Sequence, residues 1–122
     1  MEMTMYDVGR IAYSINKNIM LPNLQMIAGY IKRDNIDKVF VSSSNTISVT
    51  FETPTTLSVI KELIYTILRT VLFAHVEFIT EHCIGYSPTK SEDDTLYFIN
   101  NYVHMLYTCM QVSETSFNII FI

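Results

Sequence analysis

The stretch from Thr46 to Ile79 constrains the fold of this chain more than any other segment. Its first part, TISVTFET, alternates apolar and polar residues, a pattern typical of a strand with one buried face. Residues 56–71 repeat apolar residues at steps of three and four, which predicts a helix with one apolar stripe. The stripe consists of Leu57, Ile60, Ile64, Ile67, Leu68 and Val71. Val59 and Leu63 widen the apolar surface beyond what one sheet face requires, which indicates a second partner for this helix.

Two helices are predicted before this stretch. Residues 4–20 keep apolar residues at helical spacing, and Thr4 with Asp7 is an acceptable capping pair at their start. Pro22 suits the first turn of a second helix, which we expect to end near Asp34.

The other predicted elements are a strand at 38–42 that forms a hairpin with the strand from Thr46, a strand at 72–79, a loop at 81–90, a helix from Ser91 to Met110, and a strand at 117–122. Ser91 and Asp94 have the spacing of a capping box at the start of the last helix. Pro54 marks the end of the strand that begins at Thr46. The expected fold is of the α+β class, with helices on one face of a small mixed sheet. We interpret 1–122 as a single domain in which 1–37 is a helical N-terminal extension and 38–122 the core.

Composition excludes several classes of function. Hydrophobic residues make up 49% of the chain and charged residues 16%, so either a well-filled core or an obligate interface is expected. The net charge of −4 argues against a dedicated nucleic-acid binder. No apolar run is long enough to span a membrane. Two cysteines cannot build a disulfide scaffold, and no secretory signal is recognisable, so an intracellular location is expected.

Reactive side chains are present but form no recognised motif. His82 and Cys83 are adjacent, yet a thiol hydrolase needs a geometry that adjacency does not provide. Cys109 is expected to be a small buried residue. Structural zinc sites use paired spacings such as C-x-x-C, which the chain lacks. The acidic run at residues 92–94 is explained by the first turn of a helix. We therefore expect no catalytic residue, no cofactor and no metal.

Three short segments occur in a distinctive order. These are Val49, Thr50, Phe51 and Glu52, then Thr56 and Leu57, then Val71, Leu72, Phe73 and Ala74. This order resembles the α-like assembly subunits of multisubunit RNA polymerases, in which a strand ending in T-F-E precedes a helix opened by T-L, and V-L-F-A begins the next strand. The resemblance is greatest to the small α-like subunit of RNA polymerase II and archaeal subunit L. The α-like subunits of poxvirus polymerases show a run that is similar to Asn45, Thr46 and Ile47.

The chain also departs from this family. Ser58 and Val59 stand where the family usually has G-N, a further strand is shortened or lost around 84–88, and 1–37 has no counterpart. These departures suit a divergent viral or plasmid-borne polymerase, which would be cytoplasmic.

The resemblance implies assembly rather than catalysis. In this family the chain would be an obligate hetero-oligomer, pairing with a second α-like chain to form the platform for the large catalytic subunits, with no specific nucleic-acid contact and no membrane. The residues expected at the partner interface are Thr56, Leu57, Ile60, Ile64, Ile67, Leu96, Val103 and Leu106. The alternatives are a free-standing viral interaction or regulatory module that binds a host partner, and, far behind, a small hydrolase using Cys83.

Overall fold

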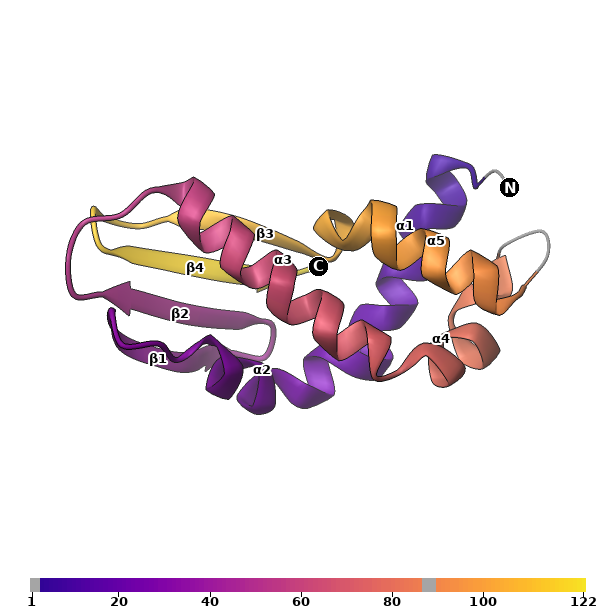
Figure 1. The fold of residues 1–122 in the computed structure, drawn as a ribbon, viewed down its shortest axis with the longest axis horizontal. Helices are drawn as coiled ribbons and strands as arrows, with labels where there is room; N and C mark the ends of the chain where they lie inside the picture. The colour runs from indigo at the N-terminus through magenta and orange to yellow at the C-terminus, as the bar shows by residue number, and fades with distance from the viewer. Residues whose placement is uncertain (1–2, 87–89) are drawn as a thin grey trace.

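The fold belongs to the α+β class and has an elongated shape (Figure 1). It was obtained as a computed structural model, which describes residues 3–86 and 90–122. A four-stranded sheet with two covering helices forms one end, and three further helices form the other end.

The N-terminal segment is helical almost without a break. Helix α1, Met5–Ile15, begins with the predicted capping box, in which the Thr4 hydroxyl accepts from the Asp7 N–H and the Asp7 carboxylate accepts from the Thr4 N–H. A π-helical turn, Asn16–Met20, and a 3-10 turn, Leu21–Asn23, connect α1 to α2, Leu24–Ile31. Pro22 therefore lies in the connecting turn, and α2 ends before Asp34 as expected.

The sheet consists of two hairpins. Strand β1, Ile36–Ser43, pairs with β2, Thr46–Phe51, and β3, Tyr107–Gln111, pairs with β4, Ser116–Phe121. The strand order is β1-β2-β4-β3 and every pairing is antiparallel, so the expectation of a mixed sheet is wrong. The predicted C-terminal strand is confirmed, and its central position buries Phe117, Ile119 and Phe121.

Buried and more exposed side chains alternate along β2 and β4, so the two faces of the sheet differ. The buried residues of the two central strands are Ile47, Val49, Phe51, Phe117, Ile119 and Phe121, and they share one core with helices α2 and α3. Polar pairs lie at the centre of the other face: the Ser48 hydroxyl donates to Asn118 Oδ1 at 2.9 Å, and the Thr50 and Ser116 hydroxyls lie 3.2 Å apart. Helices cover one face of the sheet, as the alternation predicted.

Helix α3, Leu57–Phe73, lies across the apolar face of the sheet (Figure 1). It is followed by a second helix, α4, Val76–His82, so the strand predicted at 72–79 is wrong. Around the junction of α3 and α4, the side chains of Val71, Leu72, Ile79 and Cys83 are buried. Ile79 and Cys83 are four residues apart, which places both on one side of a helix. Within the loop expected at 81–90, residues 81 and 82 complete α4 and Ile84–Tyr86 form a 3-10 turn; Pro88 lies outside the described residues.

The last helix is shorter than expected. Helix α5, Glu92–Tyr102, begins with the predicted capping box of Ser91 and Asp94. A 3-10 turn, Val103–Leu106, leads into β3, so the helix does not continue to Met110. Tyr107 and Cys109 are buried while Thr108 and Met110 are exposed, which is the period-2 burial of a strand.

The described part of the N-terminal segment belongs to the same core as the rest of the chain. Val8, Ile11 and Ile15 are fully buried in the cluster that also contains the sheet residues. Asn16, itself 1% exposed, donates from Nδ2 to the Leu106 carbonyl at 2.9 Å and to the Ile122 carbonyl at 2.7 Å. Residues 3–37 are therefore part of the folded core and do not extend from it.

Candidate functional site

The side chains of His82 and Cys83 do not form a nucleophile and base pair. The His82 ring packs on Phe78, with 4.6 Å between ring centroids, and its Nε2 lies 3.9 Å from a Glu81 carboxylate oxygen. Cys83 is 1% exposed, and burial raises the pKa of its thiol, an effect that a hydrogen bond with Ser14 only partly offsets. A catalytic cysteine needs the opposite shift, because the thiolate is the nucleophile.

The acidic residues at the start of α5 cap the helix. The Asp94 carboxylate accepts from the Ser91 N–H at 3.1 Å. Glu92 and Asp93 lie in the first turn, where the helix dipole favours negative charge. Over the residues that the structure describes, no three His, Cys, Asp or Glu side chains come together in a way that could hold a metal ion.

A small hollow of about 260 Å³ lies where α3 meets the edge strand β3. Its lining residues are Lys61, His104, Tyr107, Thr108 and Cys109. Burial, with smaller contributions from Cys109 and Tyr65, raises the pKa of Tyr107 to about 12. Burial likewise raises the pKa of Cys109 to about 11, despite the nearby Lys61 ammonium, which lowers it. Both groups therefore stay neutral and unreactive near neutral pH.

Most residues predicted for a partner interface are covered by the chain itself. Ile60, Ile64, Ile67, Val103 and Leu106 are each at most 5% exposed. The apolar stripe of α3 packs against the sheet and the neighbouring helices, so these five side chains reach a partner only if the core opens. The other three are accessible: Thr56 is exposed, and Leu57 and Leu96 are half-buried.

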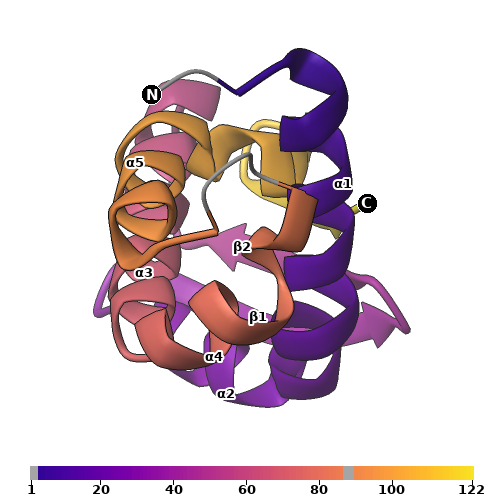
Figure 2. The same ribbon diagram turned by 90° about the vertical axis from the view of Figure 1, so that its right-hand side faces the viewer.

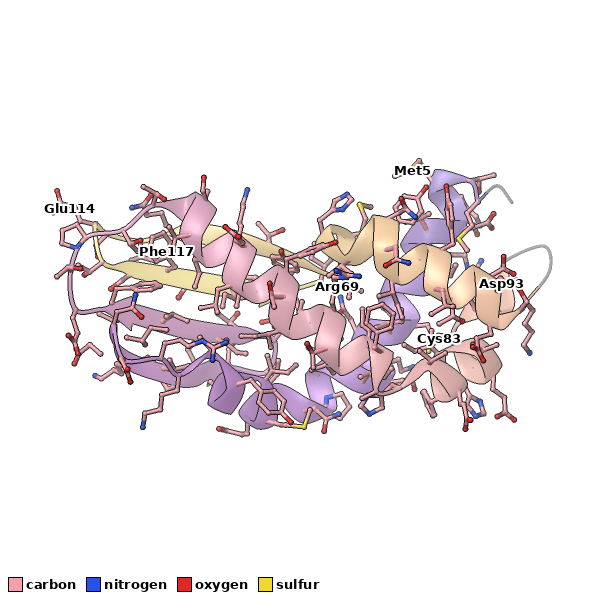
Figure 3. All side chains as sticks on the ribbon, viewed as in Figure 1. Met5, Arg69, Cys83, Asp93, Glu114 and Phe117 are labelled. Carbon is pink, nitrogen blue, oxygen red and sulfur yellow. The ribbon has the colours of Figure 1, made fainter. Side chains whose placement is uncertain are left out.

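The outward side of α3 carries a group of side chains that the sequence analysis did not single out. Arg69 lies between Tyr65 and Phe73, with its guanidinium carbon 5.5 Å and 5.3 Å from the two ring centroids. Its Nη2 donates to Asn100 Oδ1 on α5 at 2.9 Å, where α3 passes α5 (Figure 3). We call Tyr65, Arg69, Phe73, Leu96 and Asn100 the α3–α5 face. The signal in the sequence is the spacing of Tyr65, Arg69 and Phe73 at four-residue steps.

The contacts of Arg69 hold its guanidinium in one place, although the side chain is half-exposed. Stacking on two rings and a hydrogen bond across helices restrict the rotamers of Arg69. Among residues 3–86 and 90–122, no carboxylate forms an ion pair with it. Arg69 therefore presents an ordered cation beside the aromatic rings of Tyr65 and Phe73.

A second hollow, of about 560 Å³, continues this face. Apolar and charged residues line it together: Phe73, Ala74, His75, Val76, Glu77, Phe78, Glu92 and Leu96. Phe73 and Phe78 are 41% and 39% exposed, which is high for side chains of this size. The arrangement combines exposed aromatic side chains and an ordered arginine with a hollow of mixed polarity, and aromatic residues and arginine are enriched in protein-binding surfaces.

Comparison of the chain with protein-family models, with curated proteins and with solved structures finds no match. Within the described ranges, no helix has both the length and the apolar content required to cross a bilayer.

Proposed function

We propose that this chain is a non-catalytic subunit that binds another protein through the α3–α5 face. The observation that carries the proposal is the position of Arg69, held between Tyr65 and Phe73 and bonded to Asn100. Arginine and tyrosine are enriched among the residues that contribute most to binding energy. Because Arg69 is already ordered, binding a partner carboxylate there loses little side-chain entropy.

The assembly that we propose is a DNA-directed RNA polymerase, with a second α-like chain and the large catalytic subunits as partners. The supporting argument is the resemblance at residues 49–52 and 56–57. In the structure β2 ends at Phe51 and α3 begins at Leu57, which is the strand-to-helix order of that family.

Two features limit the resemblance. Residues 71–73 are the last turn of α3, and Ala74 caps it, whereas the family begins a strand there. Helix α5 is short and is followed by β3 and β4, whereas the corresponding helix of the family is long. The contact with a second α-like chain would therefore use the outward residues of α3 and α5, because their apolar stripes are occupied.

The test is affinity purification of the tagged chain from its native source, with mass spectrometry of the bound proteins. The variant Arg69→Glu reverses the charge on the α3–α5 face, and Lys32→Glu makes the same change at an exposed position beyond α2. We expect large polymerase subunits and a second α-like chain with the unaltered protein and with Lys32→Glu, but not with Arg69→Glu.

Other outcomes contradict one or both parts of the proposal. Recovery of one stoichiometric partner unrelated to a polymerase would favour the free-standing interaction module and refute the polymerase assignment. Equal recovery of partners by the two variants would refute the role of the α3–α5 face.

A further inference from the structure

Strand β3 is an edge of the sheet and carries backbone groups that point outward (Figure 1). The Val112 N–H, just beyond β3, donates to the Ser116 carbonyl at 2.8 Å. Hydrogen-bonded pairs alternate along an antiparallel ladder, so every second residue of β3 faces β4. The N–H and C=O groups of residues 107, 109 and 111 therefore point away from β4. Within the described chain, no second strand lies beside them.

The other edge strand, β1, has features that hinder the addition of a strand, and β3 lacks them. The register between β1 and β2 shifts twice, and β1 includes the charged residues Asp37 and Lys38. Bulges and charges of this kind protect an exposed edge from pairing. Strand β3 keeps one register with β4 throughout, and none of its five residues is charged. The β3 edge is therefore open to pairing with another strand.

Side chains on both faces of β3 are available to an added strand. On the open face of the sheet, Met110 is 51% exposed. On the opposite face, the hollow of about 260 Å³ lies beside Tyr107 and Cys109. A strand paired with β3 alternates its side chains between the same two faces. Main-chain hydrogen bonds combined with a pocket for alternate side chains are the mode of recognition by strand addition.

Lys61 of α3 gives this hollow a positive charge. The lining that the structure describes includes Lys61 and His104 and no acidic residue. Between residues 3 and 86 and from 90 onward, no carboxylate lies at ion-pair distance from the Lys61 ammonium. A carboxylate on a strand beside β3 is therefore complementary to the hollow. The sequence of β3, YTCMQ, contains no acidic residue, so the β3 of a second copy of this chain cannot supply the carboxylate.

We propose that the β3 edge binds an extended, acidic segment of a partner protein as a fifth strand of the sheet. In antiparallel pairing, the partner residue opposite Cys109 exchanges N–H to C=O hydrogen bonds with it in both directions. The side chain of that partner residue lies on the same face as Cys109 and enters the hollow, so we assign a glutamate or aspartate to this position. Its two neighbours lie on the open face, where valine or another apolar residue fits beside Met110.

This edge is separate from the α3–α5 face. Figure 2 faces the helical end of the molecule and shows α4 and α5 in front of the strands. The hollow beside β3 shares no lining residue with the hollow that continues the α3–α5 face. The chain can therefore hold one partner at each surface.

The experiment uses the isotope-labelled full chain and a seven-residue peptide with blocked ends. The peptide has a central glutamate, a valine on each side of it, and serine or threonine at the outer positions. At saturating peptide, we expect hydrogen exchange at the amides of residues 107, 109 and 111 to slow at least tenfold. The amides of residues 108 and 110 already face β4, so their exchange should change far less.

Modified peptides test the mode of binding. A lysine in place of the central glutamate repels Lys61, and we expect at least tenfold weaker binding. N-methylation of the central glutamate removes the N–H that donates to the Cys109 carbonyl, and binding should fall at least tenfold. N-methylation of the following valine alters an N–H that points away from β3, so this peptide should retain its affinity.

Matched substitutions test the charge of the hollow. Lys61→Glu reverses this charge, and Lys38→Glu makes the same change on β1, the opposite edge of the sheet. Both lysines are exposed, so both variants keep the fold. We expect at least tenfold weaker binding of the glutamate peptide by Lys61→Glu and unchanged binding by Lys38→Glu. Lys61→Glu should also bind the lysine peptide more tightly than the unaltered chain does.

Four results would overturn the proposal. These are no slowing of exchange at residues 107, 109 and 111 at millimolar peptide, equal affinities for the glutamate and lysine peptides, equal affinities for the two N-methylated peptides, and equal binding by the two lysine variants. Slow exchange at the same amides that depends on the concentration of the chain alone would also overturn it, by assigning the edge to a second copy. The experiment involves neither Arg69 nor a polymerase subunit, so its failure is separate from failure of the proposed function.

Discussion

Alkaline conditions should destabilise this fold through the buried thiol of Cys109. The pKa of this group is raised from 9.0 to about 11 because the Cys109 side chain, on β3, is buried and only 8% exposed. A raised folded-state pKa means that the folded chain holds the proton more tightly than the unfolded chain. The associated stability is fully present below pH 9 and is lost as the pH rises through 11.

The size of the effect follows from these two values. A shift of about two units corresponds to about 2.7 kcal/mol when the titration is complete. At pH 10, midway between the two values, about 1.4 kcal/mol of the free energy of unfolding is lost. Tyr107, whose pKa is raised to about 12, begins to contribute at the same pH, with about 0.4 kcal/mol if its unfolded-state value is 10.0.

The assay is urea unfolding under reducing conditions at pH 8 and pH 10, for the unaltered chain and for Cys109→Ala. The substitution lowers stability at both pH values by leaving a cavity, but the difference between the two pH values cancels that loss. We expect the unaltered chain to lose about 1.4 kcal/mol more than Cys109→Ala over this interval. Tyr107→Phe serves as a control and should retain most of the loss. Equal losses for the unaltered chain and Cys109→Ala would show that the thiol is not buried as described.

Three further substitutions test other parts of the fold. Ser91→Ala removes the cap of α5 and should lower stability by about 1 kcal/mol, which thermal unfolding would record as a fall in Tm; an unchanged Tm would contradict the capping box. Ile64→Asp places a charge at a position with 0% exposure and should unfold the chain in circular dichroism, so a folded variant would show that Ile64 lies at a surface. A Cβ built at Gly9 in α1 has no heavy atom within 4 Å, so Gly9→Ala should raise the free energy of unfolding by about 0.5–1 kcal/mol in urea, and a loss of stability would mean that the position is not open.

Several local features were predictable because neighbouring residues are sufficient to produce them. The capping boxes of α1 and α5 use two side chains three residues apart, and both form as predicted. The period-2 pattern of residues 46–51 and the strand at the C-terminus are also confirmed. Such features depend on spacing along the chain, which the sequence contains.

The errors fall where the same residues satisfy two periodicities. Residues 72–79 are rich in β-branched and aromatic side chains, yet they form the end of α3 and most of α4. Residues 103–110 keep helical spacing, yet they form a turn and strand β3, because β4 supplies hydrogen-bond partners along its length. In the second segment, pairing with β4 overrides the local helical preference.

The candidate sites also combine features that the sequence predicts with features that depend on the packed structure. The sequence identified the apolar stripe of α3 and its surplus of apolar residues, but Ile60, Ile64 and Ile67 proved to be core residues. Which stripe meets the sheet and which remains outside depends on how α3 crosses the strands and meets α5. The position of Arg69 between two rings and beside Asn100 has the same origin, since Asn100 is 31 residues away.

The sequence by itself determined the α+β class, the capped starts of α1 and α5, and the strands β1, β2 and β4, because each follows from short-range patterns of polarity and hydrogen bonding. Only the tertiary structure decided the order of the strands, the secondary structure of residues 72–79 and 103–110, and the division of apolar residues between core and surface. The physical reason is that burial is a property of the packed chain: an apolar side chain gains the same free energy against any partner, and the arrangement of all the elements selects which one it meets.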